Sequence, residues 1–223
     1  MVVLGYREIG GSLESENTRT GMAARMGFME LMFRDGYMLA RHLEDRHGAR
    51  AALVPPSYPL DMGPDALGLS ADVSLRHGAV AAGLGVLGRH NLLIHPRLGT
   101  RVVFAAVLTD LMLESDPRVT QALCDDCGLC VEACPARALA VEGETQVFTC
   151  LKVSQSYGIR AVYKYLQRFV GASPDEQRVL LKEPILLQAH QATGLGFQYT
   201  CNRCMAVCRA GSAVVLDSRG GEG

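Results

Sequence analysis

The eight cysteines are the residues whose type and spacing most directly predict chemistry. The first four form the pattern C-x2-C-x2-C-x3-C followed by proline, and the last three form C-x2-C-x3-C. Thiolates at these spacings bind iron–sulfur clusters, because a short loop directs three sulfurs to one cluster and the fourth cysteine ligates a second one. The pattern therefore predicts two [4Fe–4S] clusters, with the ligands Cys124, Cys127, Cys130, Cys134, Cys150, Cys201, Cys204 and Cys208.

A count of ligands assigns each cysteine to one cluster. The first group supplies three thiolates to one cluster and one to the other, and the second group supplies two and one. One cluster is then a single thiolate short, and Cys150 is the only cysteine outside both groups. We expect one cluster to be held by Cys124, Cys127, Cys130 and Cys208, and the other by Cys134, Cys150, Cys201 and Cys204.

Zinc and disulfides are the alternative uses of these cysteines. Structural zinc favours paired C-x2-C knuckles a dozen or more residues apart, whereas four of these cysteines lie within eleven residues. Disulfides need an oxidising compartment, and the N-terminus has no secretion signal. We therefore expect a cytoplasmic protein whose clusters form the core of its second half, which should not fold stably without metal.

The composition is that of a soluble globular protein. The chain has 223 residues, 48% of them hydrophobic and 20% charged, which suits one domain or two small ones. Lys plus Arg is 22 and Asp plus Glu is 23, so no basic excess indicates a nucleic-acid partner. No apolar run is long enough to cross a membrane, so neither nucleic acid nor membrane is expected as a partner.

Two domains and a tail are predicted, because the first 123 residues contain no cysteine. Residues 1–110 alternate between strand and helix patterns, 111–215 hold the cysteines, and 216–223 read as a flexible tail. The patterns predict strands over 2–4, 51–54, 92–94 and 101–108, and helices over 17–47 and 72–82. Methionines at helical spacing in 17–47 favour core packing over a cofactor site. Because the chain starts on a strand, we expect that an N-terminal piece is missing.

The segment 83–88 matches G-x-G-x-x-G, a pattern also found in dinucleotide-binding proteins, and Asp110 follows about twenty residues later. That fingerprint needs a strand before the glycines and a helix after them. Here the predicted order is reversed, so a phosphate would meet the wrong end of the helix dipole. We expect these glycines to allow close backbone approach, either to a packed neighbour or to a flat cofactor.

Residues 81–96 (AAGLGVLGRHNLLIHP), followed by Gly99, Thr109, Asp110 and the double-cluster module, resemble the epoxyqueuosine reductase family. That family and the reductive dehalogenases share a nitroreductase-like cobalamin domain followed by a ferredoxin-like module with two [4Fe–4S] clusters. The resemblance covers residues 70–210, with a looser match over 2–56. It implies an α/β (α+β) fold, with 1–110 as the nitroreductase-like cofactor and substrate domain and 111–215 as the ferredoxin-like domain.

The resemblance also implies a function. An iron–sulfur oxidoreductase would pass single electrons through the two clusters to a cobalamin-type cofactor, which would reduce a small substrate. A low-potential donor such as ferredoxin or flavodoxin would supply the electrons, and a homodimer is conceivable. The implied cofactor contacts are Arg76, His77, Gly85, Gly88, Arg89, His90 and Asn91. The alternative is a non-catalytic electron-transfer protein, or a reductive activator of a corrinoid or flavin protein.

Three departures separate this chain from the family pattern. The family carries a proton-donating aspartate shortly before the glycine-rich block, whereas this chain has Leu69 at the aligned position. Asp72 is three residues away, and we expect it to cap the helix over 72–82. Arg209 follows Cys208 in place of the usual proline, and we expect the extension that would hold a tRNA to be missing. We therefore expect a short, divergent member that does not act on epoxyqueuosine tRNA.

Overall fold

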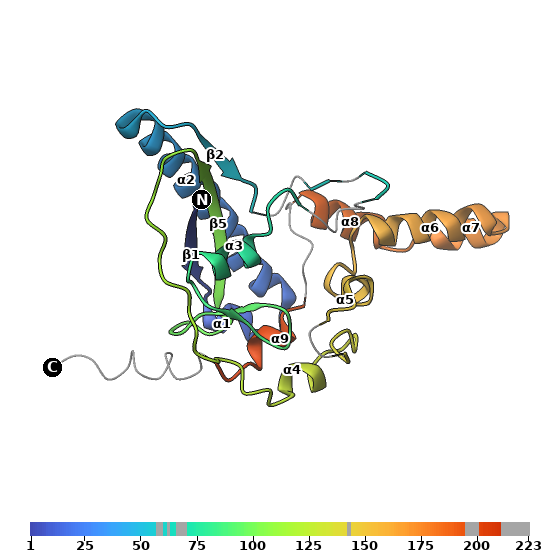
Figure 1. Ribbon diagram of the computed structural model, residues 1–223. Helices are drawn as coiled ribbons and strands as arrows, with labels where there is room; N and C mark the ends of the chain where they lie inside the picture. The colour runs from blue at the N-terminus through green and yellow to red at the C-terminus, as the bar shows by residue number, and fades with distance from the viewer. Residues whose placement is uncertain (57–59, 62, 66–70, 142–143, 195–200, 211–223) are drawn as a thin grey trace.

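The computed structural model describes the chain except for residues 57–59, 62, 66–70, 142–143, 195–200 and 211–223. The first half contains the main sheet, and the cysteine-containing second half continues into a helical arm that projects to one side (Figure 1). The α/β fold class is confirmed. The predicted tail, 216–223, lies outside the described residues. Within the described residues, no helix combines the length and the apolar content needed to cross a membrane.

A three-stranded antiparallel sheet organises the first half. Its order is β1 (Val2–Arg7), β5 (Val102–Thr109), β2 (Ala51–Val54), so β5 is central and pairs with both neighbours. The sequence of β5 is apolar along its whole length instead of alternating, because both of its faces are covered. Helix α2 (Thr18–His47) covers one face, and α3 (Leu75–Ala81) with the short strand β4 (Leu93–Ile94) covers the other.

Helix α2 begins and ends as the sequence predicts. The Asn17 side chain accepts a hydrogen bond from the backbone N–H of Arg19 at 3.0 Å, and Gly48 ends the helix with a φ of 63°. Phe28 and Met32 pack against Ala105 in the centre of β5. Met32 is buried and Met29 packs against the same cluster, which agrees with the predicted core packing, whereas Met38 on this helix is exposed.

Two details of the region after α2 differ from the prediction. Helix α3 begins at Leu75 with Ser74 in the N-cap position, so Asp72 precedes the helix and does not cap it. The predicted strands over 92–94 and 101–108 are present as β4 and β5, and the turn between them closes through a His95–Gly99 bridge. β4 pairs with β3 (Val86–Leu87), which lies inside the glycine-rich segment and was not predicted as a strand.

The glycines of this segment serve close packing. A helix precedes them and a strand follows, so the rejection of a dinucleotide-binding fingerprint is confirmed. Gly83 has a φ of 77°, and a Cβ there would lie 2.4 Å from the carbonyl oxygen of Pro117. A Cβ on Gly85 would lie 2.1 Å from the carbonyl oxygen of Ile94. Asp110 pairs with Arg50 at 2.9 Å.

Replacing Gly85 by alanine should destabilise the first half strongly. The added methyl group would meet the backbone of Ile94, which cannot move without breaking the β3–β4 pairing. Overpacking of this kind costs about 1–3 kcal/mol or more. Gly27→Ala is the matched control, because a methyl group on Gly27 in α2 would have nothing within 4 Å of it, and alanine favours helices there. Denaturant unfolding should show a loss for Gly85→Ala and none for Gly27→Ala, and equal stabilities would contradict this account.

The second half consists of short helices around the cysteines and a longer helical arm. Helices α4 (Leu129–Glu132) and α9 (Arg203–Ala206) pack against each other, and α5 (Val147–Ser154) carries Cys150. The arm contains α6 (Ile159–Gly171), α7 (Pro174–Leu180) and α8 (Ile185–Gly194) and lies between Cys150 and Cys201 in the sequence. The remaining helix, α1 (Gly10–Leu13), precedes α2 in the first half.

Candidate functional site

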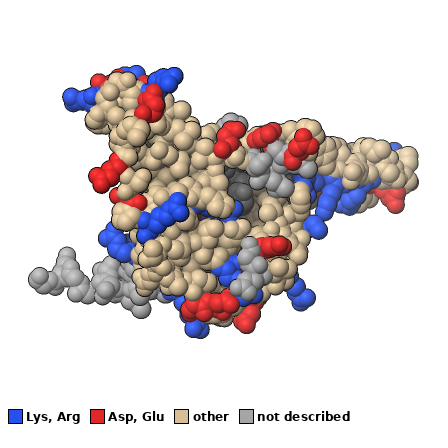
Figure 2. Space-filling model, viewed as in Figure 1, with Lys and Arg blue, Asp and Glu red and all other residues tan. Residues whose placement is uncertain are grey.

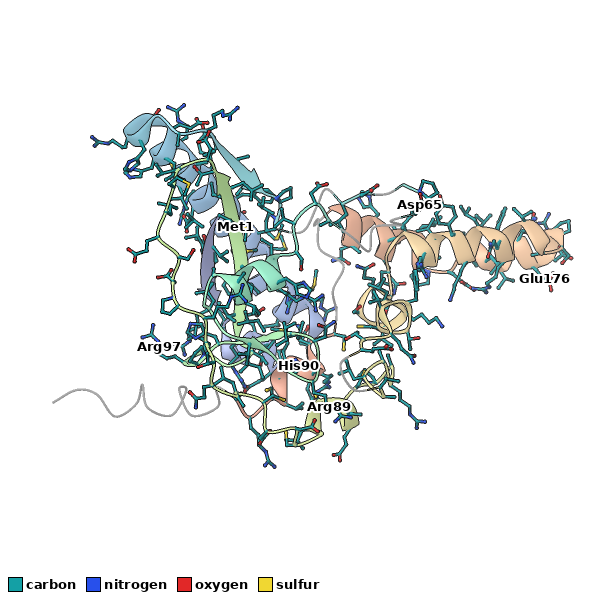
Figure 3. All side chains as sticks on the ribbon, viewed as in Figure 1. Met1, Asp65, Arg89, His90, Arg97 and Glu176 are labelled. Atoms are coloured by element: carbon teal, nitrogen blue, oxygen red, sulfur yellow. The ribbon has the colours of Figure 1, made fainter. Side chains whose placement is uncertain are left out.

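Four cysteines line one cavity of about 250 Å³ at the junction of the two halves. Three of them come from the loop before α4 and from α4 itself, and the fourth follows α9. Arg89 and His90, from the β3–β4 hairpin, complete the same cavity, and Figure 3 shows these two residues near α4 and α9. The four cysteines are Cys124, Cys127, Cys130 and Cys208.

The loop that carries the first three cysteines owes its shape to local contacts. Asp126 has a φ of 51° and Gly128 a φ of 75°, so the chain reverses tightly between the cysteines. The Asp125 carboxylate accepts a hydrogen bond from the backbone N–H of Cys127 at 3.2 Å. Arg89 donates to both oxygens of Asp126, at 2.7 and 3.0 Å, and thereby attaches the loop to the first half.

The other four cysteines lie on α5, on α9 and in the segments next to α4 and α9. Cys204 lies on α9, Cys150 on α5, and Cys134 two residues after α4. The backbone N–H of Ala138 donates to the Sγ atom of Cys134 at 3.3 Å. Cys201 and Val153 line a second cavity of about 190 Å³ against α1 and α2.

The neighbouring thiols that shift the pKa values of individual cysteines divide the eight cysteines into the same two sets of four. Burial raises the pKa of Cys150, and Cys201 and Cys134 raise it further. Burial also raises the pKa of Cys208, with Cys124 and Cys127 as its coupled thiols. Burial, followed by Cys201, Cys150, Cys134 and Cys130, raises the pKa of Cys204 to about 12. Cys130 is the one thiol of the first set that raises the pKa of Cys204, and its effect is the smallest of the four.

This environment fits iron–sulfur clusters. A buried thiolate surrounded by other thiolates needs a positive counter-charge, and a [4Fe–4S] core supplies one. None of the eight cysteines forms a disulfide. Among the described residues, no three His, Cys, Asp or Glu side chains are arranged to share a single metal ion. A cubane is bound differently, because each thiolate ligates a different iron atom.

Two arginines, the buried Arg101 and the partly buried Arg25, join the first half to α9, and neither was predicted as a site residue. Arg25 pairs with the buried Glu8 at 3.2 Å and donates to the Met205 Sδ atom at 3.6 Å. Arg101 pairs with Glu14 at 2.9 Å and reaches the Ala206 carbonyl oxygen at 3.4 Å. These cations lie next to the segment that carries Cys204 and Cys208. Nothing in their spacing signals this role, because the partners are distant in the sequence.

The described residues do not gather the seven implied cofactor contacts into one cavity. Arg76 donates to the carbonyl oxygen of Asn91, and the Nδ1 atom of His77 lies 2.7 Å from the Ser74 hydroxyl. Gly85 faces the Ile94 carbonyl, and Gly88 faces the side chains of Ile94 and His90. Arg89 and His90 do line a cavity, and it is the one that contains cysteines. Most of these groups are thus engaged by neighbouring residues of the chain, whereas the Nε2 atom of His90 has no hydrogen-bond partner among the described residues.

The fold and the cysteine arrangement define an α/β protein with a ferredoxin-like iron–sulfur module. A family model described as "4Fe-4S binding domain" matches residues 117–139. The chain is 28% identical to the epoxyqueuosine reductase of Staphylococcus aureus over 136 residues, which are 61% of this chain and 29% of that protein. It is 44% identical over 72 residues to a tetrachloroethene reductive dehalogenase of Desulfitobacterium hafniense, covering 31% of this chain and 13% of the relative.

A solved structure shows the same fold. A crystal structure of an epoxyqueuosine reductase with a tRNA stem loop matches with a TM-score of 0.52 and 21% identity, over 82% of this chain and 39% of that one. The chain is therefore similar to members of the epoxyqueuosine reductase and reductive dehalogenase families. It spans less than a third of the length of these two curated relatives.

Proposed function

We propose that this chain is an iron–sulfur oxidoreductase that moves single electrons through two [4Fe–4S] clusters. The observation that carries the proposal is the grouping of eight cysteines, none of them in a disulfide, into two sets that meet at α9. When bound, such clusters each accept and release one electron at a time. The chain holds the two sets on or next to α4, α5 and α9, and Arg25 and Arg101, each paired with a glutamate, contact α9.

The proposal also concerns the group that accepts the electrons from the clusters. The family resemblance implies a cobalamin-type cofactor in the first half, used to reduce a small substrate. Because most of the implied contact groups are engaged by neighbouring residues of the chain, no step is assigned to a corrinoid. The same observation favours the second candidate function, an electron-transfer protein or reductive activator that passes electrons to a corrinoid or flavin protein.

The proposed partners follow from charge and redox chemistry. A low-potential protein such as ferredoxin or flavodoxin would supply the electrons, in the cytoplasm, where thiols stay reduced. The net charge of −1 becomes about −5 with two clusters bound, since each cluster with its thiolates adds about −2. Acidic and basic side chains are interspersed on the face shown in Figure 2. We therefore propose a small-molecule or protein acceptor and not a tRNA. We also propose that two copies of the chain can form a homodimer.

Metal analysis tests the central claim. After anaerobic reconstitution we expect about eight iron and about eight sulfide per chain. A value near four iron, or stoichiometric zinc, would contradict the two-cluster assignment.

A second experiment distinguishes the two candidate functions: the reconstituted protein is incubated with hydroxocobalamin and passed through a desalting column. Retained corrinoid absorption would support an enzyme with its own cofactor, and an iron–sulfur spectrum alone would support the electron carrier.

A further inference from the structure

His90 is a buried histidine whose second ring nitrogen has no partner among the described residues. The side chain is 4% exposed, and its Nε2 atom forms no hydrogen bond there. The backbone N–H of Leu92 donates to the Nδ1 atom at 3.1 Å. Because Nδ1 accepts that hydrogen bond, the neutral ring carries its proton on Nε2. A buried N–H donor without an acceptor is unfavourable, which suggests that a ligand supplies the acceptor.

The ring is held in place by its neighbours. Burial lowers the pKa of His90 to about 4, so the ring is a neutral donor at neutral pH. A Cβ on Gly88 would lie 2.9 Å from the Cε1 atom of His90 and 2.7 Å from the Cδ1 atom of Ile94. The last glycine of the glycine-rich segment thus leaves room for the imidazole. The hairpin presents His90 at the wall of the cysteine-lined cavity (Figure 3).

The lining of that cavity suits an iron–sulfur cluster. Its walls carry four thiols, which are Cys124, Cys127, Cys130 and Cys208. Four thiolates complete the coordination of a cubane, so no iron site is left for an imidazole. The thiolate and sulfide sulfurs of a cluster accept hydrogen bonds, and they become better acceptors when the cluster gains an electron.

We infer that His90 is a positioning residue whose Nε2–H donates a hydrogen bond to a sulfur of the cluster held by these four cysteines, and thereby raises the reduction potential of that cluster. The inference rests on the proposed two-cluster function. The other cluster is unaffected by His90 and so provides an internal reference.

The experiment is a redox titration of the reconstituted protein followed by electron paramagnetic resonance. His90→Leu should keep the full iron content but lower the potential of one cluster. The expected change is about tenfold in its reduction equilibrium, which for a one-electron couple is about 59 mV. His90→Gln, which keeps an N–H donor, should recover part of the shift. His95→Leu is the matched control, because the Nδ1 atom of His95 also accepts backbone hydrogen bonds but His95 does not line this cavity.

A measurement on the unmodified protein covers the case in which a variant fails to fold. With isotope-labelled histidine, pulsed resonance should detect a weak nitrogen coupling to one reduced cluster. A strong coupling, typical of nitrogen bound to iron, or no coupling at all would overturn the inference. Unchanged potentials in a fully loaded His90→Leu protein would overturn it as well. Low iron in the unmodified protein would instead count against the two-cluster function.

Discussion

Replacing Cys150 by alanine is expected to remove or damage one cluster and leave the other intact. Cys150 lies on α5, outside both cysteine groups, and its thiol is coupled to those of Cys201 and Cys134. Without this ligand, one iron of that cluster has no protein thiolate. Iron should fall from about eight to about four per chain, or to about seven where a three-iron cluster survives.

Electron paramagnetic resonance of the reduced variant provides the measurement. One [4Fe–4S] signal should persist, and the other should vanish or be replaced by a [3Fe–4S] signal after oxidation. Ser154→Ala is the matched control, because Ser154 is buried on the same helix and its hydroxyl lies 3.9 Å from the Cys150 sulfur. Two unchanged cubanes in Cys150→Ala would show that Cys150 is not a ligand.

Cys204→Ala and Cys208→Ala should damage different clusters, although the two residues are four positions apart. Cys208 lines the cavity with Cys124, Cys127 and Cys130, whereas the thiol of Cys204 is coupled mainly to the opposite set. Each single variant should lose about four iron. Met205→Leu, between them, preserves volume and both thiols and should retain both clusters.

Double variants test most directly whether Cys204 and Cys208 ligate different clusters. Cys150→Ala combined with Cys204→Ala removes two ligands of one cluster, so about four iron should remain. Cys150→Ala combined with Cys208→Ala removes a ligand from each cluster, so iron should be almost entirely lost. Equal iron contents in the two double variants would refute the crossing arrangement at α9.

The domain pattern of the first half could be predicted because its signals are local. Helix α2 is specified by residues three and four apart, by Asn17 at its start and by Gly48 at its end. The order of helix and strand around the glycines was likewise sufficient to reject a dinucleotide site. Strand pairing was not predictable in the same way. The turn at His95–Gly99 indicates a hairpin, but β5 joins β1 and β2 because its apolar faces are covered by α2 and α3.

The helical arm was not predicted either, because no structure was assigned to the interval between Cys150 and Cys201. Helices α6, α7 and α8 occupy this interval, and Tyr165 joins two of them by donating to the Leu180 carbonyl at 3.1 Å. Several apolar side chains of the arm remain exposed, among them Val170 and Leu187. Helix α6 is nevertheless strongly amphipathic, so its periodic pattern was a signal from which this helix could have been predicted.

By itself, the sequence determined the chemistry of the cysteines, since thiolates two or three residues apart can reach a shared cluster wherever the loop lies. Only the tertiary structure decided what surrounds them. Arg89 meets Asp126 across 37 residues, and Thr100 donates to the Met205 carbonyl across 105. The burial of His90 likewise depends on how the hairpin packs against the cysteine loop. Such partners follow from the packing of segments far apart in the chain, and no local spacing encodes them.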